Sequence, residues 1–187
     1  WILLIILFPV FGTFVYVLML ISLLFGKTFR NIIQEQKKAS SYYIQDESII
    51  DEIRNENPDY VSQLAFLSEE GFPFYHNTGF EYYAPCENGL DVMLEELQKA
   101  EKYIFMEYFI IEEGFMFNSI LSILEEKVKQ GVEVRVMYDD MGSLGTLPAS
   151  YARQLEKKGI KAVSFNRISP IINTIMNHRD HRKIMVI

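Results

Sequence analysis

The chain has too little cysteine for a disulfide-bonded protein and too little positive charge for a non-specific nucleic-acid binder. Its single cysteine, Cys86, has no partner for an internal disulfide, and this is typical of a reducing compartment. Lysine and arginine number 18 against 25 aspartate and glutamate residues, a formal net charge of −7. Non-specific nucleic-acid binding needs a basic surface, so we expect no nucleic-acid partner.

Nucleotide-binding signatures and internal repeats are also missing. Residues 142–146, Gly-Ser-Leu-Gly-Thr, are rich in glycine, but no G-K-[ST] follows them. A phosphate-binding loop of the nucleoside-triphosphatase type is therefore excluded. The sequence contains no internal repeat and no low-complexity tract, which leaves an ordinary globular domain as the main architecture to expect.

One long run without any charge opens the chain. Residues 1–25 are almost wholly apolar, and a helix rising ~1.5 Å per residue over this length would cross a ~30 Å hydrocarbon core. We predict a transmembrane helix over 1–26, kinked at Pro9 and Gly12. The run lacks a basic leading segment and a cleavage site, which disfavours a signal peptide. Four basic residues that follow place the rest of the chain in the cytoplasm: Lys27, Arg30, Lys37 and Lys38.

Beyond the apolar run, the sequence predicts a linker and then an α/β domain. Residues 27–60 are polar and mixed in charge, so we expect a helical continuation of the apolar run and then a cytoplasmic linker. The domain is expected over 61–187. From residue 80 onward, strand-like and helix-like patterns alternate, which indicates a sheet covered by helices. The expected strands cover 80–83, 103–111, 132–138, 160–165 and 182–187, and the expected helices cover 90–100, 119–130 and 147–158, with glycines 131 and 159 ending the last two.

A histidine and a lysine two residues apart are the main candidates for chemistry. His181 and Lys183 begin the last expected strand, so both side chains should lie on one face of it. An imidazole can attack phosphorus, while an ammonium can neutralise the oxygens of a phosphate. The pair therefore predicts a site for phosphodiester chemistry.

Three segments resemble the phospholipase D superfamily, and within it the bacterial cardiolipin synthases. The stretch N-H-R-D-H-R-K-I over 177–184 is similar to the start of that family's H-x-K-x-x-x-x-D motif. The segment Y-I-F-M-E-Y-F-I-I over 103–111 resembles its I-x-x-E-Y-F-I strand. The segment G-V-E-V-R-V-M-Y-D-D-M-G-S over 131–143 is similar to its G-V-E-V-R-x-x-x-D-D-x-G-S stretch. The order and spacing of the three segments agree with the family.

The resemblance implies a fold and a reaction. The fold would be an incomplete α/β/α sandwich, and the chain an amino-terminal fragment in which the motif aspartate would follow Ile187. The reaction would join two phosphatidylglycerol molecules into cardiolipin through a phosphohistidine, with Lys183 holding the phosphate oxygens. His181 is the candidate nucleophile, and one motif leaves open which of the two histidines attacks and which acts as the acid. A second histidine would come from the missing carboxyl-terminal half or from a dimer mate. No cofactor or metal is implied, and the protein would work at the anionic bilayer of a bacterial cell membrane, with its catalytic part in the cytoplasm.

Four further residues are candidates for supporting roles. Asp139 and Asp140 follow an expected strand, where they would shape the rim of the site or cap the next turn. Glu107 lies in an otherwise apolar strand and needs a basic partner, because a buried carboxylate is costly alone. Arg179 would meet phosphate or face solvent.

Three alternatives remain open. His178 and His181 could bind a metal together with Asp180 or with the pair Asp139 and Asp140, although this stretch is expected to be a loop leading into a strand. The protein could be another enzyme of the superfamily: a phospholipase, a phosphatidylserine synthase or a tethered nuclease. It could also be a membrane-anchored module that keeps the fold without catalysing a reaction.

Overall fold

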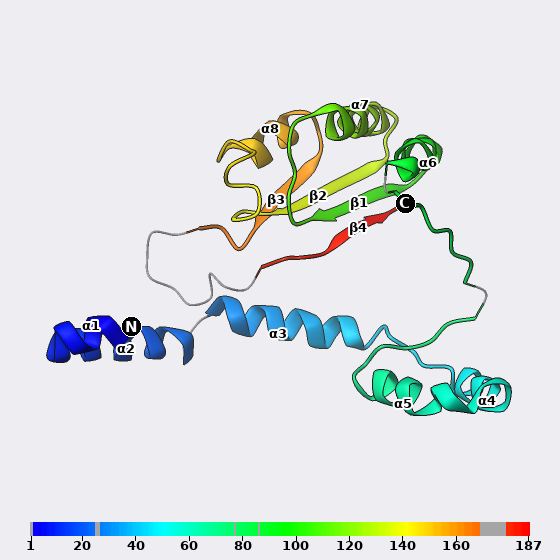
Figure 1. The fold of residues 1–187 in the computed structure, drawn as a ribbon. Helices are drawn as coiled ribbons and strands as arrows, with labels where there is room; N and C mark the ends of the chain where they lie inside the picture. Colours follow the sequence, from blue (N-terminus) through cyan, green and yellow to red (C-terminus); the bar gives the residue numbers. More distant parts are fainter. Residues whose placement is uncertain (1, 25–26, 77, 86, 169–178) are drawn as a thin grey trace. The chain divides into compact units, whose positions relative to one another are not determined.

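The structure is a computed structural model that describes residues 2–24, 27–76, 78–85, 87–168 and 179–187. Contacts along the chain divide it into two compact units. One contains residues 1–23 together with 83–187, and the other contains residues 24–82. Figure 1 shows the helices and strands of both. The domain boundaries expected from the sequence stay predictions.

The apolar run at the start of the chain forms two helices. Helix α1 covers Ile2–Leu7 and helix α2 covers Pro9–Leu24, with an interruption at Phe8. A side-chain carbon at Gly12 would lie 2.7 Å from the carbonyl oxygen of Leu4, so the close approach of the two helices depends on glycine. None of the described helices combines the length and the apolar character needed to cross a membrane. The predicted transmembrane helix over 1–26 is therefore not confirmed.

Residues 24–82 contain the expected helical continuation, α3, and further helices that were not predicted from the sequence. Helix α3 covers Lys27–Ser40, α4 covers Glu47–Glu56, a 3-10 turn η1 covers Pro58–Tyr60, and α5 covers Val61–Glu69. The carboxylate of Asp46 accepts the backbone N–H of Ser48 at 3.0 Å and caps α4. The strand predicted over 80–83 is wrong. Phe80 and Tyr82 are 91% and 83% exposed, and these residues pair with no described strand. Aromatic residues favour strands only where they can pack.

A four-stranded sheet organises residues 83–187. Strand β1 covers Tyr103–Tyr108, β2 Glu133–Asp139, β3 Lys161–Phe165 and β4 Lys183–Val186. The spatial order is β3-β2-β1-β4, with β1, β2 and β3 parallel and β4 antiparallel to β1. Helix α7, Phe115–Lys129, links β1 to β2, and α8, Tyr151–Lys157, links β2 to β3. The predicted mixed α/β class is confirmed.

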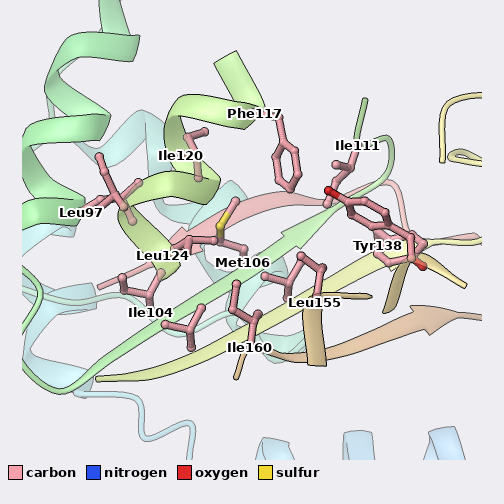
Figure 2. Packing of buried hydrophobic residues seen from close by; sticks show 14 of the residues in the cluster. Leu97, Ile104, Met106, Ile111, Phe117, Ile120, Leu124, Tyr138, Leu155 and Ile160 are labelled. Atoms are coloured by element: carbon pink, nitrogen blue, oxygen red, sulfur yellow. The ribbon is translucent and has the colours of Figure 1, made fainter. Parts of the chain in front are cut away.

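Helices cover one face of this sheet. Helix α6, Asn88–Lys99, lies with α7 and α8 on the same side (Figure 1). Alternate residues of β1 and β2 point toward these helices and are almost fully buried, as period-two patterning requires. Figure 2 shows the resulting core, which includes Leu97, Ile104, Met106, Ile120, Leu124, Leu155 and Ile160. Gly131 and Gly159 follow α7 and α8 at φ of 89° and 84°, which confirms that these glycines end the two helices.

The other face of the sheet is exposed and largely apolar, with charged residues such as Arg135 and Lys161 among the apolar ones. Val163 on β3 and Ile184 and Val186 on β4 keep 55%, 41% and 44% of their surface accessible. Together with Phe105 and Met137 they line a hollow of about 600 Å³. The second helical layer of the expected sandwich remains a prediction, because no described helix of residues 83–187 lies on this face.

Candidate functional site

The candidate residues meet at one edge of the sheet, where β1 and β2 end. Strand β4 runs antiparallel to β1 with Lys183 opposite Tyr108, so His181 lies just beyond the carboxyl end of β1. His181 precedes β4 and Lys183 is its first residue, and both side chains are exposed. Ligands of open α/β sheets commonly bind at such an edge.

His181 and Lys183 both contact the ring of Phe109. The imidazole stacks on this ring with the centroids 4.3 Å apart and the planes at 15°. The Nζ atom of Lys183 lies 5.2 Å from the centroid of the same ring, within range for a cation–π interaction. Nζ also donates a hydrogen bond of 2.5 Å to the carbonyl oxygen of His181. The imidazole and the ammonium are thereby brought together in space as the sequence predicts.

The carboxylate of Asp139 joins β2 to the segment that carries His181. It is fully buried, and its Oδ1 accepts the backbone N–H groups of Met141 and Gly142 at 2.9 and 3.0 Å. Its Oδ2 accepts the backbone N–H of Asp180 at 2.9 Å, and the guanidinium of Arg179 lies 3.3 Å from Oδ1. Asp139 therefore caps the turn as predicted, and it also fixes the backbone immediately before His181.

Arg179 is placed differently from the sequence prediction. Its side chain is only 8% exposed, and its Nη1 donates to the carbonyl oxygen of Asn166 at 3.0 Å as well as pairing with Asp139. The solvent-facing alternative is therefore wrong for this side chain, and its contact with phosphate stays a prediction. Burial with a charged partner indicates that Arg179 holds the segment in place.

The loop after β2 also fixes the loops after β1 and β3. Asp140 accepts the backbone N–H of Ile168 at 2.9 Å through Oδ2. The hydroxyl of Ser143 accepts the N–H of Ile111 at 3.1 Å, and the hydroxyl of Thr146 donates to the carbonyl oxygen of Ile111 at 2.6 Å. Residues 139–146 thus connect the loops at this edge of the sheet.

Glu107 has the basic partner that the sequence requires. The Nη2 atom of Arg182 lies 2.5 Å from Oε1 of Glu107, and Nε of Arg182 lies 3.2 Å from Oδ1 of Asp180. Burial raises the pKa of Glu107 to about 6, helped by a hydrogen bond with the Asp180 carboxyl and opposed by the Arg182 charge. Burial also opposes ionisation of Asp180, but hydrogen bonds from Glu107 and Arg182 leave its pKa below the usual value. Folding therefore favours the protonated form of Glu107 and the ionised form of Asp180.

Sequence reasoning missed Phe109, Ser143 and Asp180 as parts of this arrangement. Phe109 lies in the expected strand over 103–111, and Ser143 in a glycine-rich stretch with no expected role. The sequence indicates Asp180 only as a possible metal ligand, although its place beside His181 is a signal for a role at the site. Among the described residues, no three histidine, cysteine, aspartate or glutamate side chains gather as a metal site. His178, the other predicted ligand, lies outside the described residues.

Comparison with other proteins gives relatives that match the entire chain. A protein of Streptococcus mutans described as "Uncharacterized protein" is 42% identical over 195 residues, and the match covers 41% of its length. Proteins named "Cardiolipin synthase" from Oceanobacillus iheyensis and Staphylococcus aureus are 30% and 31% identical over all of this chain. The chain spans about two fifths of their length, 40% and 39% respectively. No protein-family model matches the chain.

Among solved structures, the chromatin protein TrmBL2 of an archaeon matches with 16% identity and a TM-score of 0.37, covering 77% of this chain and 53% of that one. A likeness of this size carries no argument about fold or function. The matches cover all three segments described above and the histidine and lysine that the structure brings together, because they extend over 100% of this chain. Along its whole length the chain is therefore similar to bacterial proteins named cardiolipin synthase, of which it spans about two fifths.

Proposed function

We propose that the full-length protein transfers a phosphatidyl group between two phosphatidylglycerol molecules, forming cardiolipin and releasing glycerol. The observation that carries this proposal is the exposed pair of His181 and Lys183, held against one aromatic ring at an edge of the sheet. The similarity to proteins named cardiolipin synthase supports a phospholipid as the phosphodiester.

The proposed reaction has two displacements at one phosphorus. A ring nitrogen of His181 bonds to phosphorus, and the bond from phosphorus to the glycerol oxygen breaks. A second histidine, from the rest of the protein or from a dimer mate, protonates the leaving glycerol. That histidine then takes the proton from a hydroxyl of the second phosphatidylglycerol, which attacks phosphorus and breaks the nitrogen–phosphorus bond. The ammonium of Lys183 neutralises the non-bridging oxygens during both steps.

The proposal includes a place in the cell. Both substrates reside in the bilayer, so binding to an anionic bacterial membrane would raise the local concentration of enzyme and substrate. The apolar helices α1 and α2 are the proposed membrane contact, and the basic residues after them favour a cytoplasmic catalytic part. A site that excludes water would favour transfer over hydrolysis.

The test is replacement of His181 by alanine in the full-length protein. Membranes containing the variant are supplied with phosphatidylglycerol labelled in the phosphate, and the lipid products are separated. Loss of the nucleophile should lower cardiolipin formation at least about a thousandfold.

Replacement of Lys183 by alanine removes charge stabilisation and should lower cardiolipin formation about a hundredfold or more. In wild-type protein quenched during turnover, the label should form a protein adduct that acid releases and alkali preserves.

The matched control is His76→Ala. His76 is an exposed histidine of residues 24–82 that pairs with Glu52 at 3.2 Å, so its loss should leave product formation unchanged. Cardiolipin formation by the His181 variant at the wild-type rate would show that another group attacks phosphorus. Phosphatidic acid as the main wild-type product would identify a phospholipase, and an inactive wild-type protein would favour the non-catalytic module.

A further inference from the structure

The ring of Phe109 touches both groups of the proposed phosphotransfer site. It stacks on the His181 imidazole at 4.3 Å and lies 5.2 Å from the Lys183 ammonium nitrogen. Both of these side chains are exposed, whereas Phe109 is half-buried. An exposed lysine has four rotatable bonds and an exposed histidine two, so a fixed ring beside them limits the orientations they adopt.

Phe109 is itself held by the loop after β2. A side-chain carbon at residue 142 would lie 2.3 Å from the Phe109 carbonyl oxygen and 2.9 Å from two of its ring carbons. Only glycine permits this approach, and the N–H of Gly142 donates a hydrogen bond to the buried carboxylate of Asp139. Two residues after Phe109, the N–H of Ile111 donates a hydrogen bond to the Ser143 hydroxyl, and its carbonyl oxygen accepts one from the Thr146 hydroxyl. The ring therefore projects from backbone that is fixed on both sides.

We propose that Phe109 is a positioning residue, which orients the imidazole of His181 and the ammonium of Lys183 toward one phosphate. The inference rests on the proposed function, because it assigns Phe109 a part in that reaction. Displacement of a reacting group by about 1 Å can cost a hundredfold in rate, so a ring that orients two such groups at once affects turnover without touching substrate.

The competing explanation is that Phe109 only fills space. Two variants separate these roles in the full-length protein. Phe109→Leu keeps an apolar side chain but removes the aromatic face, and Phe109→Tyr keeps the face. Positioning predicts that the leucine variant loses at least tenfold in kcat with little change in KM for phosphatidylglycerol. It also predicts that the tyrosine variant retains at least half of the wild-type kcat. Thermal unfolding of each variant is measured in parallel.

A second measurement, by NMR, reports how the Phe109 ring lies against the His181 imidazole and does not depend on catalysis. In protein labelled with ¹³C-histidine, the stacked Phe109 ring should shift the ring-proton resonances of His181 upfield, and His181→Gln identifies those resonances by their loss. Phe109→Leu should move them toward the values of free histidine, while Phe109→Tyr should leave them near the wild-type positions. The resonances of His76, far from Phe109 in sequence and in the other unit, serve as the internal reference.

These outcomes decide the inference. Unchanged kcat in Phe109→Leu, or unmoved His181 resonances in it, would overturn the positioning role. Equal loss of activity in both variants, in proportion to lowered thermal stability, would also overturn it and leave Phe109 as a packing residue. If His181→Ala stays active, the proposed function fails, but the resonance shift still reports whether Phe109 orients His181. The two failures are therefore distinguishable.

Discussion

Glu107 illustrates how a single side chain at this site depends on its neighbours. Its carboxyl lies on the sheet beside that of Asp180, and Arg182 bridges the two. Burial, followed by the hydrogen bond with Asp180, raises the pKa of Glu107 to about 6 from an ordinary value of 4.5. The folded protein thus keeps a proton on Glu107 at pH values where the unfolded chain has released it.

Glu107→Gln should change how stability depends on pH. Because the pKa of Glu107 is raised by folding, its stabilising contribution is complete below pH 4.5 and is lost as pH rises through about 6. Glutamine does not titrate, so the wild type should lose stability relative to the variant over this window, by at most about 2 kcal/mol. Thermal unfolding of both proteins between pH 4.5 and 7.5 measures the difference.

The control for this prediction is the same pair of proteins in an Asp180→Asn background. There the carboxyl partner is gone, so the pH-dependent difference should shrink to the part caused by burial. A difference between wild type and Glu107→Gln that stays constant from pH 4.5 to 7.5 would contradict the assignment.

The sequence predicts the environment of some single residues but not the contacts of others. The need of Glu107 for a basic partner followed from the cost of a buried charge, and Arg182 meets it. The burial of Arg179 could not be predicted, since it depends on Asp139, a partner far away along the chain. The contact of Phe109 with His181 was missed for the same reason, because sequence patterning assigns a face to a residue but no distant neighbour.

At the scale of elements, residues 139–146 act as a connector between the loops at the site. Asp139→Asn removes one charge from this connector and leaves the side chain nearly the same size. The ion pair between residue 139 and the buried Arg179 guanidinium would be lost, and an amide cannot accept at both of its atoms. We expect a loss of about 3 kcal/mol in the free energy of unfolding, measured by denaturant titration.

The double variant Asp139→Asn with Arg179→Met tests the cause. Removing both charges should recover part of the lost stability, so the two single effects should not add. Additive effects would mean that the ion pair contributes nothing, and that the hydrogen bonds of Asp139 to the backbone carry its whole effect.

Elements with a strong internal pattern were predicted well, and elements that depend on context were not. The helices over 90–100 and 119–130 and the strand over 132–138 have clear apolar periodicity, and the structure contains α6, α7 and β2 there. Helix α4 was missed, although Asp46 before an apolar-periodic stretch is a recognisable cap signal. The strand expected over 80–83 rested on aromatic propensity alone.

At the scale of the whole molecule, the buried apolar side chains are concentrated in one unit. Among the described residues, Ile49 is the only buried apolar side chain outside 97–160. Hydrogen exchange should therefore be slow in β1 and β2 and fast in α4 and α5.

Leu124→Ala empties a fully buried position in the core. It should lower the free energy of unfolding by about 2–5 kcal/mol and speed exchange in the sheet.

Ile49→Ala is the counterpart in residues 24–82. It should speed exchange in α4 and α5 and leave the sheet amides unchanged, because the two units are separate groups of contacts. Exchange that rises across both units in either variant, measured by mass spectrometry of the full-length protein, would show that they unfold together.

The exposed face of the sheet determines how residues 83–187 would behave if they were prepared alone. This face exposes the apolar side chains of Phe105, Met137, Val163 and Ile184 to water. An exposed apolar patch favours association, so two copies could bury the face against each other. Strands β3 and β4 add open edges to which further copies could pair. Keeping these residues soluble on their own therefore requires that the exposed face be shielded by detergent or by the remaining polypeptide, or be made polar by charged substitutions.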